Sequence, residues 1–212
     1  MQASFLICKG QTNKLDLSLV HTLQKTYLSF STFYWGRIAD IHTESKYGLE
    51  SFDGWKAISI RTYRAKFSYL AADHLKHIRE IIQKFPPLEQ EKLDNNWITI
   101  EANFVLLWIS QISHAVCNII QSPQSKPSDG IFRVMMVRDN CSRFTLAKIL
   151  SSLRSGEHIA YKEVEWIECV AYRLVPSTND GNFVLDGENI EPGPIQACVL
   201  PSSLNVFYHP LS

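Results

Sequence analysis

The sequence predicts a mainly β protein with antiparallel strands and two or three helices. Short runs of β-branched and aromatic residues, separated by turn residues, recur along the chain, as is typical of strands. Leu15, Leu17 and Leu19 alternate with polar residues, which indicates a sheet with one solvent-exposed face. Apolar residues recur at helical spacing in only three stretches, so few helices are expected.

Nine segments have the composition of strands. They are residues 5–8, 15–20, 26–38, 97–100, 104–109, 131–137, 164–176, 183–185 and 195–199. The run 104–109 is continuously apolar, so it should be buried on both faces.

Helices are expected over residues 73–85, 110–120 and 142–153. Asp73 and Ser142 are candidate N-caps, and Gly156 is suited to a left-handed C-terminal cap. The first helix has an apolar stripe and a basic opposite face, so it could touch a membrane surface or pack on the core. We favour packing on the core.

Composition excludes several function classes. The formal net charge is zero, which gives no reason to expect a nucleic-acid partner. The sequence has neither a signal-peptide pattern nor an apolar run of about 18 residues, so no membrane-spanning helix is expected. The five cysteines form no Cys-x-x-Cys pair, which argues against a metal site and favours reduced thiols in a cytoplasmic protein.

The segment 181–201 contains the most informative turn. Asp186-Gly187 is a turn dipeptide that follows a β-favouring run, so a hairpin with two carboxylates, Asp186 and Glu188, at an exposed tip is expected. Such a tip is most often only a turn, and its residues alone do not reveal a ligand.

Four stretches in order resemble one family. Residues 184–188 read Val-Leu-Asp-Gly-Glu, residues 35–45 read Trp-Gly-Arg-Ile-Ala-Asp-Ile-His-Thr-Glu-Ser, and residues 171–174 read Ala-Tyr-Arg-Leu. With the pattern of residues 137–158, they resemble the sphingosine kinases and their diacylglycerol kinase relatives, over about residues 6–208. The resemblance implies that residues 1–212 are a C-terminal lipid-binding domain, an antiparallel two-layer β-sandwich with two or three helices.

The resemblance also implies site residues. Asp186, Gly187 and Glu188 would contact the nucleotide, and no residue of this chain is expected to be catalytic. The residues expected to contact lipid are Asp40, His42, Leu106, Trp108, Leu146, Ile149, Leu150, His158 and Trp166. His42 stands where the family has a second Asp that contacts the lipid head group, so it is either a head-group ligand or a surface histidine. The helix around Leu146 either lines a lipid channel or is an ordinary core helix.

One family motif is missing from the sequence. The family's nucleotide-binding domain carries a Gly-Gly-Asp-Gly loop that binds phosphates, and no such sequence occurs here. Phosphoryl transfer depends on positioning and charge neutralisation, so this chain alone should phosphorylate nothing. The expected function is a portion of a kinase that converts sphingosine to sphingosine 1-phosphate with ATP and Mg²⁺, completed by an N-terminal domain, with peripheral membrane contact. The alternatives are a non-catalytic lipid-binding or interaction module and a β-sandwich that binds nothing.

Overall fold

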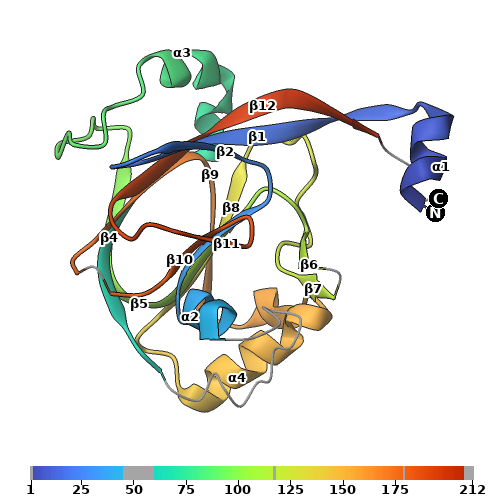
Figure 1. Ribbon diagram of the computed structural model, residues 1–212. Helices are drawn as coiled ribbons and strands as arrows, with labels where there is room; N and C mark the ends of the chain where they lie inside the picture. Colours follow the sequence, from blue (N-terminus) through green and yellow to red (C-terminus); the bar gives the residue numbers. More distant parts are fainter. Residues whose placement is uncertain (1, 45–59, 117, 179, 208–212) are drawn as a thin grey trace.

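The computed structural model describes residues 2–44, 60–116, 118–178 and 180–207, and confirms a mainly antiparallel β fold (Figure 1). Ten strands form one large sheet and two form a small one. The strands of the large sheet are β1 (Thr12–Thr22), β2 (Thr26–Ser29), β3 (Thr32–Gly36), β4 (Tyr63–Ala71), β5 (Ile98–Ser110), β8 (Phe132–Arg138), β9 (Val164–Pro176), β10 (Phe183–Leu185), β11 (Glu188–Ile190) and β12 (Ile195–Phe207). The small sheet pairs β6 (His114–Val116) with β7 (Ile119–Ile120).

The helices are short. The described helices are α1 (Gln2–Lys9), α2 (Arg37–Glu44), α3 (Ile78–Gln83) and α4 (Arg143–Ser151), with 3-10 turns η3 (Ala72–His77), η4 (Ser152–Arg154) and η5 (Glu157–Ala160). Figure 1 shows α3 at one end of the molecule, with α2 and α4 towards the opposite end. Of the described helices, none is both long and apolar enough to cross a membrane.

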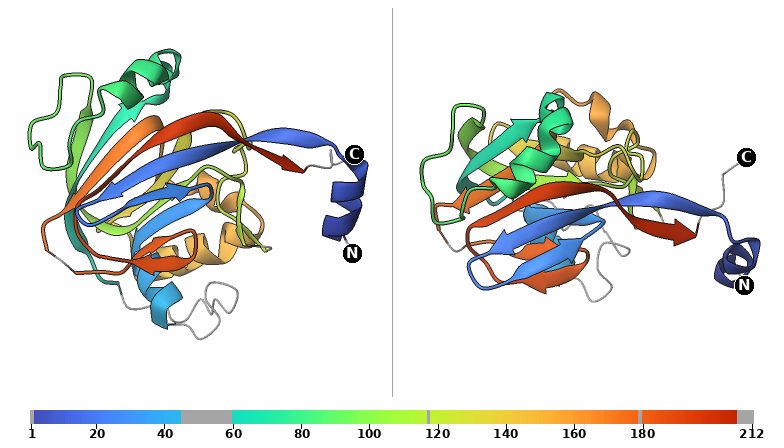
Figure 2. Two further views of the ribbon diagram at one scale, coloured as in Figure 1. Left: turned by 45° about the horizontal axis from the view of Figure 1, so that its top comes forward. Right: turned by 90° about the horizontal axis from the view of Figure 1, so that it is seen from above.

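Two long strands fold the sheet onto itself. The first half of β5 pairs with β4, and its second half pairs with β3 and β8. The first half of β9 pairs with β8, and its second half pairs with β4 and β12. The strands β4, β5, β8 and β9 therefore form a closed circuit of hydrogen bonding, and the sheet encloses a core as a β-sandwich does (Figure 2).

Alternation along the strands separates two hydrophobic clusters. In β8, Val134 and Met136 face one cluster while Met135 and Val137 face the other. We call the first the inner cluster; it fills the space enclosed by the sheet and includes Tyr172 and Leu174. The outer cluster lies on the opposite face, beneath α2 and α4. Its buried members are Tyr34, Ile38, Ala39, Ile41, Val105, Leu106, Trp108, Ile119, Met135, Val137, Cys141, Leu146, Ile149, Leu150, Leu153, Val164 and Val184.

Three secondary-structure predictions were wrong. Residues 5–8 lie in α1 rather than in a strand; α1 lies beyond the end of the sheet (Figure 1), where a helix satisfies its own backbone groups without a partner strand. Residues 37–38 begin α2, because Gly36 takes φ +82°, which ends β3. A Cβ at Gly36 would lie 2.7 Å from the carbonyl oxygen of Val105, so a larger residue does not fit this turn.

A helix was expected over residues 110–120, but Ser110 ends β5, and β6 and β7 follow as a short antiparallel pair. The Ser110 hydroxyl donates to the carbonyl of Ile112, and the amide of Gln111 donates to the carbonyl of Ser31 at 3.0 Å. These bonds hold the segment in a turn against the β2–β3 connection, so tertiary contacts override the apolar spacing.

The other two helices were predicted correctly. Ser142 caps α4 by accepting a hydrogen bond from the amide of Thr145, and Gly156 takes a left-handed φ of +77°. Asp73 does not cap its helix, since η3 starts after Ala71 with no side-chain cap. The apolar residues of η3 and α3 pack on the inner cluster, as favoured over contact with a membrane.

Candidate functional site

Two stretches far apart in sequence, α2 and the β10–β11 hairpin, meet at one place. The Thr43 hydroxyl contacts the side-chain oxygen of Asn189 at 2.9 Å, and His42 Nε2 lies 3.1 Å from the carbonyl oxygen of Gly187. The described part of the family-like segment, residues 35–44, therefore contacts the Asp186-Gly187 turn through His42.

His42 uses both ring nitrogens within the protein. A carbonyl oxygen only accepts, so Nε2 donates to Gly187, and in the neutral ring Nδ1 accepts from the Tyr34 hydroxyl at 2.9 Å. The Tyr34 and His42 rings also meet edge to face at 5.5 Å. Burial raises the pKa of Tyr34, so this phenol remains a hydrogen-bond donor at neutral pH. His42 thus links α2, β3 and the turn, rather than standing free on the surface.

Asp40 is enclosed beneath α2. It is 3% exposed, accepts hydrogen bonds from the Tyr63 hydroxyl and from Asn182 Nδ2 at 2.9 Å, and lies 3.9 Å from Arg37 Nη1. Burial and the hydrogen bond to Asp40 raise the pKa of Tyr63. The carboxylate holds α2 against β4 and the segment before β10, and a lipid head group would have to share it with these partners.

Asp186 holds the neighbouring turn. Its carboxylate accepts from the Ser29 hydroxyl at 2.9 Å and from the amides of residues 30, 31 and 32 at 3.2, 3.1 and 2.9 Å. Both carboxylate oxygens are therefore engaged by the β2–β3 connection, and the side chain is half-buried rather than exposed as expected. Glu188 is exposed and is the carboxylate of the pair that remains directed to solvent.

Aromatic residues, with Met135 between two of them, form a row across the outer face of the sheet, which we call the aromatic row. The strand register places Tyr34 opposite Trp108, Trp108 opposite Met135, and Met135 opposite Trp166. Tyr34 and Trp108 contact each other with ring centroids 5.5 Å apart. The row begins at His42 and the hairpin turn and runs towards η5, where His158 lies against Trp166 at 5.7 Å.

The structure gathers most of the expected lipid residues in the outer cluster. Leu106 and Trp108 contribute from β5, while α4 contributes Leu146, Ile149 and Leu150. All five are at most 2% exposed, and Trp166 packs against the cluster from β9. The cluster is closed, so a lipid chain would enter only if the α4 side moved or side chains rearranged.

Unpaired polar atoms lie along the row and at its η5 end. Within the described residues, Trp108 Nε1, Gln121 Oε1, His158 Nδ1 and Trp166 Nε1 are buried without a hydrogen-bond partner. His158 Nε2 bonds the carbonyl of Gln121 at 2.9 Å, and burial lowers the pKa of this imidazole, which favours the neutral ring. Buried polar groups are rarely left unpaired, so four of them along this row favour a site that receives a polar group or ordered water.

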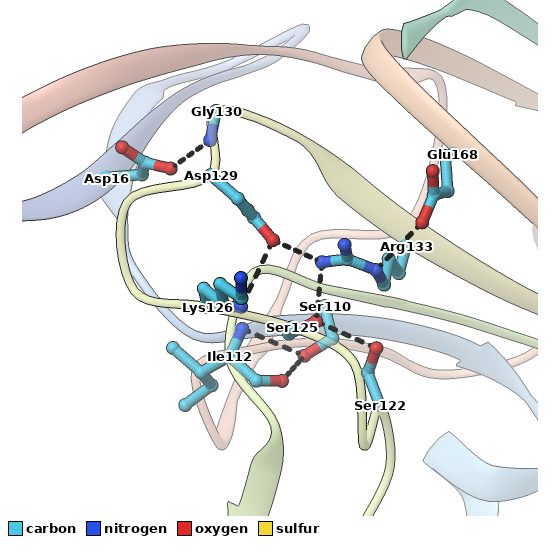
Figure 3. A network of polar contacts seen from close by, with 10 residues as sticks. All are labelled: Asp16, Ser110, Ile112, Ser122, Ser125, Lys126, Asp129, Gly130, Arg133 and Glu168. Atoms are coloured by element: carbon cyan, nitrogen blue, oxygen red, sulfur yellow. Dashed lines mark hydrogen bonds and ion pairs between the residues drawn. The ribbon is translucent and has the colours of Figure 1, made fainter.

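A cavity of about 250 Å³ adjoins this end of the row. It is lined by Ser122, Pro123, Gln124, Arg133, Ile159, Trp166 and Glu168. Figure 3 shows how its wall is fixed: Arg133 bonds Asp129 at 2.5 Å and Glu168 at 3.0 Å, and Asp16 accepts from the amide of Gly130 at 2.6 Å. The volume is below the roughly 300–1,000 Å³ typical of ligand pockets, so the cavity alone would hold only part of a lipid.

A second hollow, of about 370 Å³, lies elsewhere. It is bounded by η3, α3 and the following loop, with His77, Lys84 and Trp97 among its lining residues. None of the expected lipid residues lines it, so we place the candidate site at the outer cluster despite the larger volume here.

Sequence reasoning missed several residues of this site. Tyr34, Gln121 and Ile159 were not singled out as site residues, although Tyr34 directly precedes the quoted signature, which was a usable signal. Gln121 carried no such signal, because its burial follows from the unexpected β6–β7 hairpin. Among the described residues, no group of three or more His, Cys, Asp or Glu could hold a metal ion.

The fold and the outer cluster define a β-sandwich domain of the type found in lipid kinases. A family model described as "YegS C-terminal NAD kinase beta sandwich-like domain" matches residues 54–208, and the chain belongs to this family. Human sphingosine kinase 1 is similar, at 26% identity over 94% of this chain and 57% of its own length. Sphingoid long chain base kinase 5 of Saccharomyces cerevisiae is 27% identical over 62% of this chain and 19% of its own length.

Solved structures support the same fold. A diacylglycerol kinase from Bacillus anthracis str. Sterne superposes with a TM-score of 0.58 at 13% identity, over 99% of this chain and 58% of that one. The chain thus spans between half and two thirds of the length of human sphingosine kinase 1 and of this bacterial structure.

Proposed function

We propose that this chain is the lipid-binding portion of a kinase that transfers phosphate from ATP to sphingosine or a related sphingoid base. The observation that carries the proposal is the aromatic row, which connects the hairpin turn at Gly187 with the His158 end of the outer cluster. Similarity to sphingosine kinases over most of the chain supports the substrate class.

In this proposal the two ends of the row have different roles. The turn of Asp186, Gly187 and Glu188 faces the nucleotide, and Glu188 is the carboxylate available for it because Asp186 is already engaged. ATP with its Mg²⁺ would be held mainly by an N-terminal nucleotide-binding domain, as the resemblance to the kinase family implies. Asp40 and His42 position the turn and α2 near the lipid head group, and the hydrocarbon chain of the sphingoid base occupies the outer cluster.

A titration of the chain with sphingosine, followed by tryptophan fluorescence, tests the lipid-binding part of the proposal. Trp108 and Trp166 lie in or against the outer cluster, so lipid binding there should change their emission. Leu146→Phe should weaken sphingosine binding about tenfold or more, because the larger ring occupies the volume of the lipid chain.

Leu174→Phe is the matched control, because it makes the same change in the inner cluster. Both positions are 0% exposed, and overpacking costs roughly 1–3 kcal/mol at either. The folded Leu174→Phe protein should keep its sphingosine affinity. Equal affinity for sphingosine in the wild type and in folded Leu146→Phe would refute a lipid site in the outer cluster.

A non-catalytic lipid-binding module is the second candidate, favoured by the engagement of Asp186 in the β2–β3 connection. The two functions separate when a nucleotide-binding domain is joined upstream. Sphingosine-dependent phosphate transfer that falls in Glu188→Gln supports the kinase, whereas sphingosine binding without any transfer supports the module.

A further inference from the structure

Four polar or amphipathic side chains along the aromatic row contact one another in series. We call them the polar quartet: Trp108, Gln121, His158 and Trp166. Gln121 Nε2 lies 3.5 Å from the carbonyl oxygen of Trp108, and His158 Nε2 donates to the carbonyl of Gln121 at 2.9 Å. The His158 ring lies beside the indole of Trp166, with ring centroids 5.7 Å apart. Three of the four residues are 0% exposed, and Trp166 is half-buried.

Each member of the quartet keeps one buried polar atom without a hydrogen-bond partner among the described residues. Two of these atoms, Trp108 Nε1 and Trp166 Nε1, are donors. The other two are acceptors. Gln121 Oε1 is an amide oxygen, and His158 Nδ1 is the unprotonated nitrogen of a neutral ring whose Nε2 already donates. Burial lowers the pKa of His158, which keeps the ring neutral. Pairing of the quartet therefore needs a partner that both accepts and donates.

A hydroxyl group matches this arrangement, whereas a charged group does not. A hydroxyl donates one hydrogen bond and accepts through two lone pairs. A carboxylate or phosphate would only accept, so it would face the acceptors of Gln121 and His158 unfavourably. An ammonium would only donate, so it would face the two indole N–H groups. The charged residues of the adjoining cavity, Arg133 and Glu168, already pair with each other at 3.0 Å, so neither is free to neutralise a buried ion.

The strand register sets the distance of the quartet from the hairpin turn. The row crosses β3, β5, β8 and β9 on its way from Tyr34 to Trp166. Adjacent strands are about 4.8 Å apart, so Trp108 lies about 5 Å and Trp166 about 14 Å along the row from Tyr34. A lipid whose head group lies at the His42 end would bring the middle and distal parts of its hydrocarbon chain to the quartet. The cavity of about 250 Å³ that Trp166 also lines adds space there.

We propose that the quartet binds a hydroxyl group carried on the hydrocarbon chain of the lipid, so that the site selects chain-hydroxylated sphingoid bases. This inference rests on the proposed function, because it takes a sphingoid base as the occupant of the outer cluster. A chain without the hydroxyl would cover the quartet and leave its polar atoms unpaired, which disfavours binding. The quartet thus determines specificity at a distance from the head group that receives the phosphate.

Competition binding with a set of related lipids tests this selectivity. Radiolabelled sphinganine would be displaced from the chain by sphinganine itself, or by sphinganines that each carry one added hydroxyl at a different carbon of the middle or distal chain. At least one of these isomers should bind about tenfold more tightly than sphinganine, as expected when buried polar groups gain a partner. Phytosphingosine, whose added hydroxyl lies beside the head group, should show no such gain.

Trp166→Phe removes an indole N–H that has no partner among the described residues, so the substitution breaks no hydrogen bond described within the protein. It should lower the preference for the best hydroxylated isomer over sphinganine severalfold. Because this preference is a ratio of two affinities in one variant, a general change in lipid affinity cancels. Trp35→Phe is the matched control, since Trp35 Nε1 is also buried and unpaired but belongs to the inner cluster. The folded control should keep the full preference.

The outcomes separate this inference from the proposed function. Equal affinity of the wild type for sphinganine and for every hydroxylated isomer would overturn the inference, because ordered water would then satisfy the quartet, while the binding of sphinganine would still support the proposed function. A preference that is unchanged in Trp166→Phe would also overturn it, since the hydroxyl would then bind elsewhere. Absence of binding by all of these lipids would overturn both the inference and the proposed lipid site.

Discussion

Two substitutions in one turn, Asp186→Asn and Glu188→Gln, each replace a carboxylate by an amide. Their comparison separates a structural role from a ligand-binding one. Asp186 accepts four hydrogen bonds from residues 29–32, whereas Glu188 is exposed. Hydrogen bonds to a charged acceptor contribute about 1.5–3 kcal/mol, against about 0.5–1.5 kcal/mol for neutral ones. An Asn side chain keeps one acceptor oxygen and also tolerates the φ of +49° found at this position.

Asp186→Asn should therefore lose roughly 2–3 kcal/mol of stability once partial solvent exposure of the site is considered. For a protein of this size that corresponds to a fall in melting temperature of about 4–12 °C. Glu188→Gln should unfold within about 0.5 kcal/mol of the wild type, as surface substitutions usually do. Thermal and urea unfolding of the purified variants measure both values. Equal stability of the wild type and Asp186→Asn would show that the carboxylate is not needed to hold the β2–β3 connection.

Three further outcomes are expected. His158→Gln should make the free energy of unfolding depend less on pH in the acid range. The folded-state pKa of His158 is lowered, so the contribution of its neutral ring to stability is present above the unfolded pKa of about 6.5 and is lost as pH falls below it. The pKa of His21 is lowered too, so the test compares the wild type with His158→Gln by urea unfolding from pH 7.5 to 5. The loss of stability with falling pH should be smaller in the variant, and parallel profiles of the two proteins would contradict the expectation. Gly36→Ala should destabilise the protein by more than about 2 kcal/mol in urea unfolding, because φ is +82° and the Val105 carbonyl leaves no room for a Cβ; a wild-type midpoint would disprove that packing. The purified chain should convert no sphingosine to its phosphate with ATP and Mg²⁺, and product that accumulates with radiolabelled ATP would disprove this expectation.

The strands were predictable where burial alone determines the pattern. The continuous apolar run 104–109 is buried on both faces, since the inner cluster takes Leu107 and the outer cluster takes Leu106. The Asp186-Gly187 turn was likewise predictable, because both residues have positive φ. Burial on both faces and a positive φ are local requirements, and the types of the residues at these positions meet them.

Other features depend on contacts that local sequence does not encode. The carboxylate of Asp186 is engaged by a turn more than 150 residues earlier in the chain, so its half-burial was not predictable from the hairpin alone. The β6–β7 hairpin replaced an expected helix and buried Gln121 beside His158, which produced part of the candidate site. Leu106, Trp108 and the α4 residues of the outer cluster were identified individually, but Tyr34 and the arrangement in a row followed only from the strand register.

Photolabelling maps the proposed lipid site directly. A sphingosine analogue with a photoreactive diazirine in the middle of its chain would be crosslinked to the folded protein, and the labelled peptides identified by mass spectrometry. If the outer cluster holds the chain, the label should fall on peptides of β5 and α4 that contain Trp108 and Leu146, and excess sphingosine should suppress it. Labelling confined to the hollow beside α3, or spread over the surface and insensitive to competing sphingosine, would contradict a lipid site in the outer cluster.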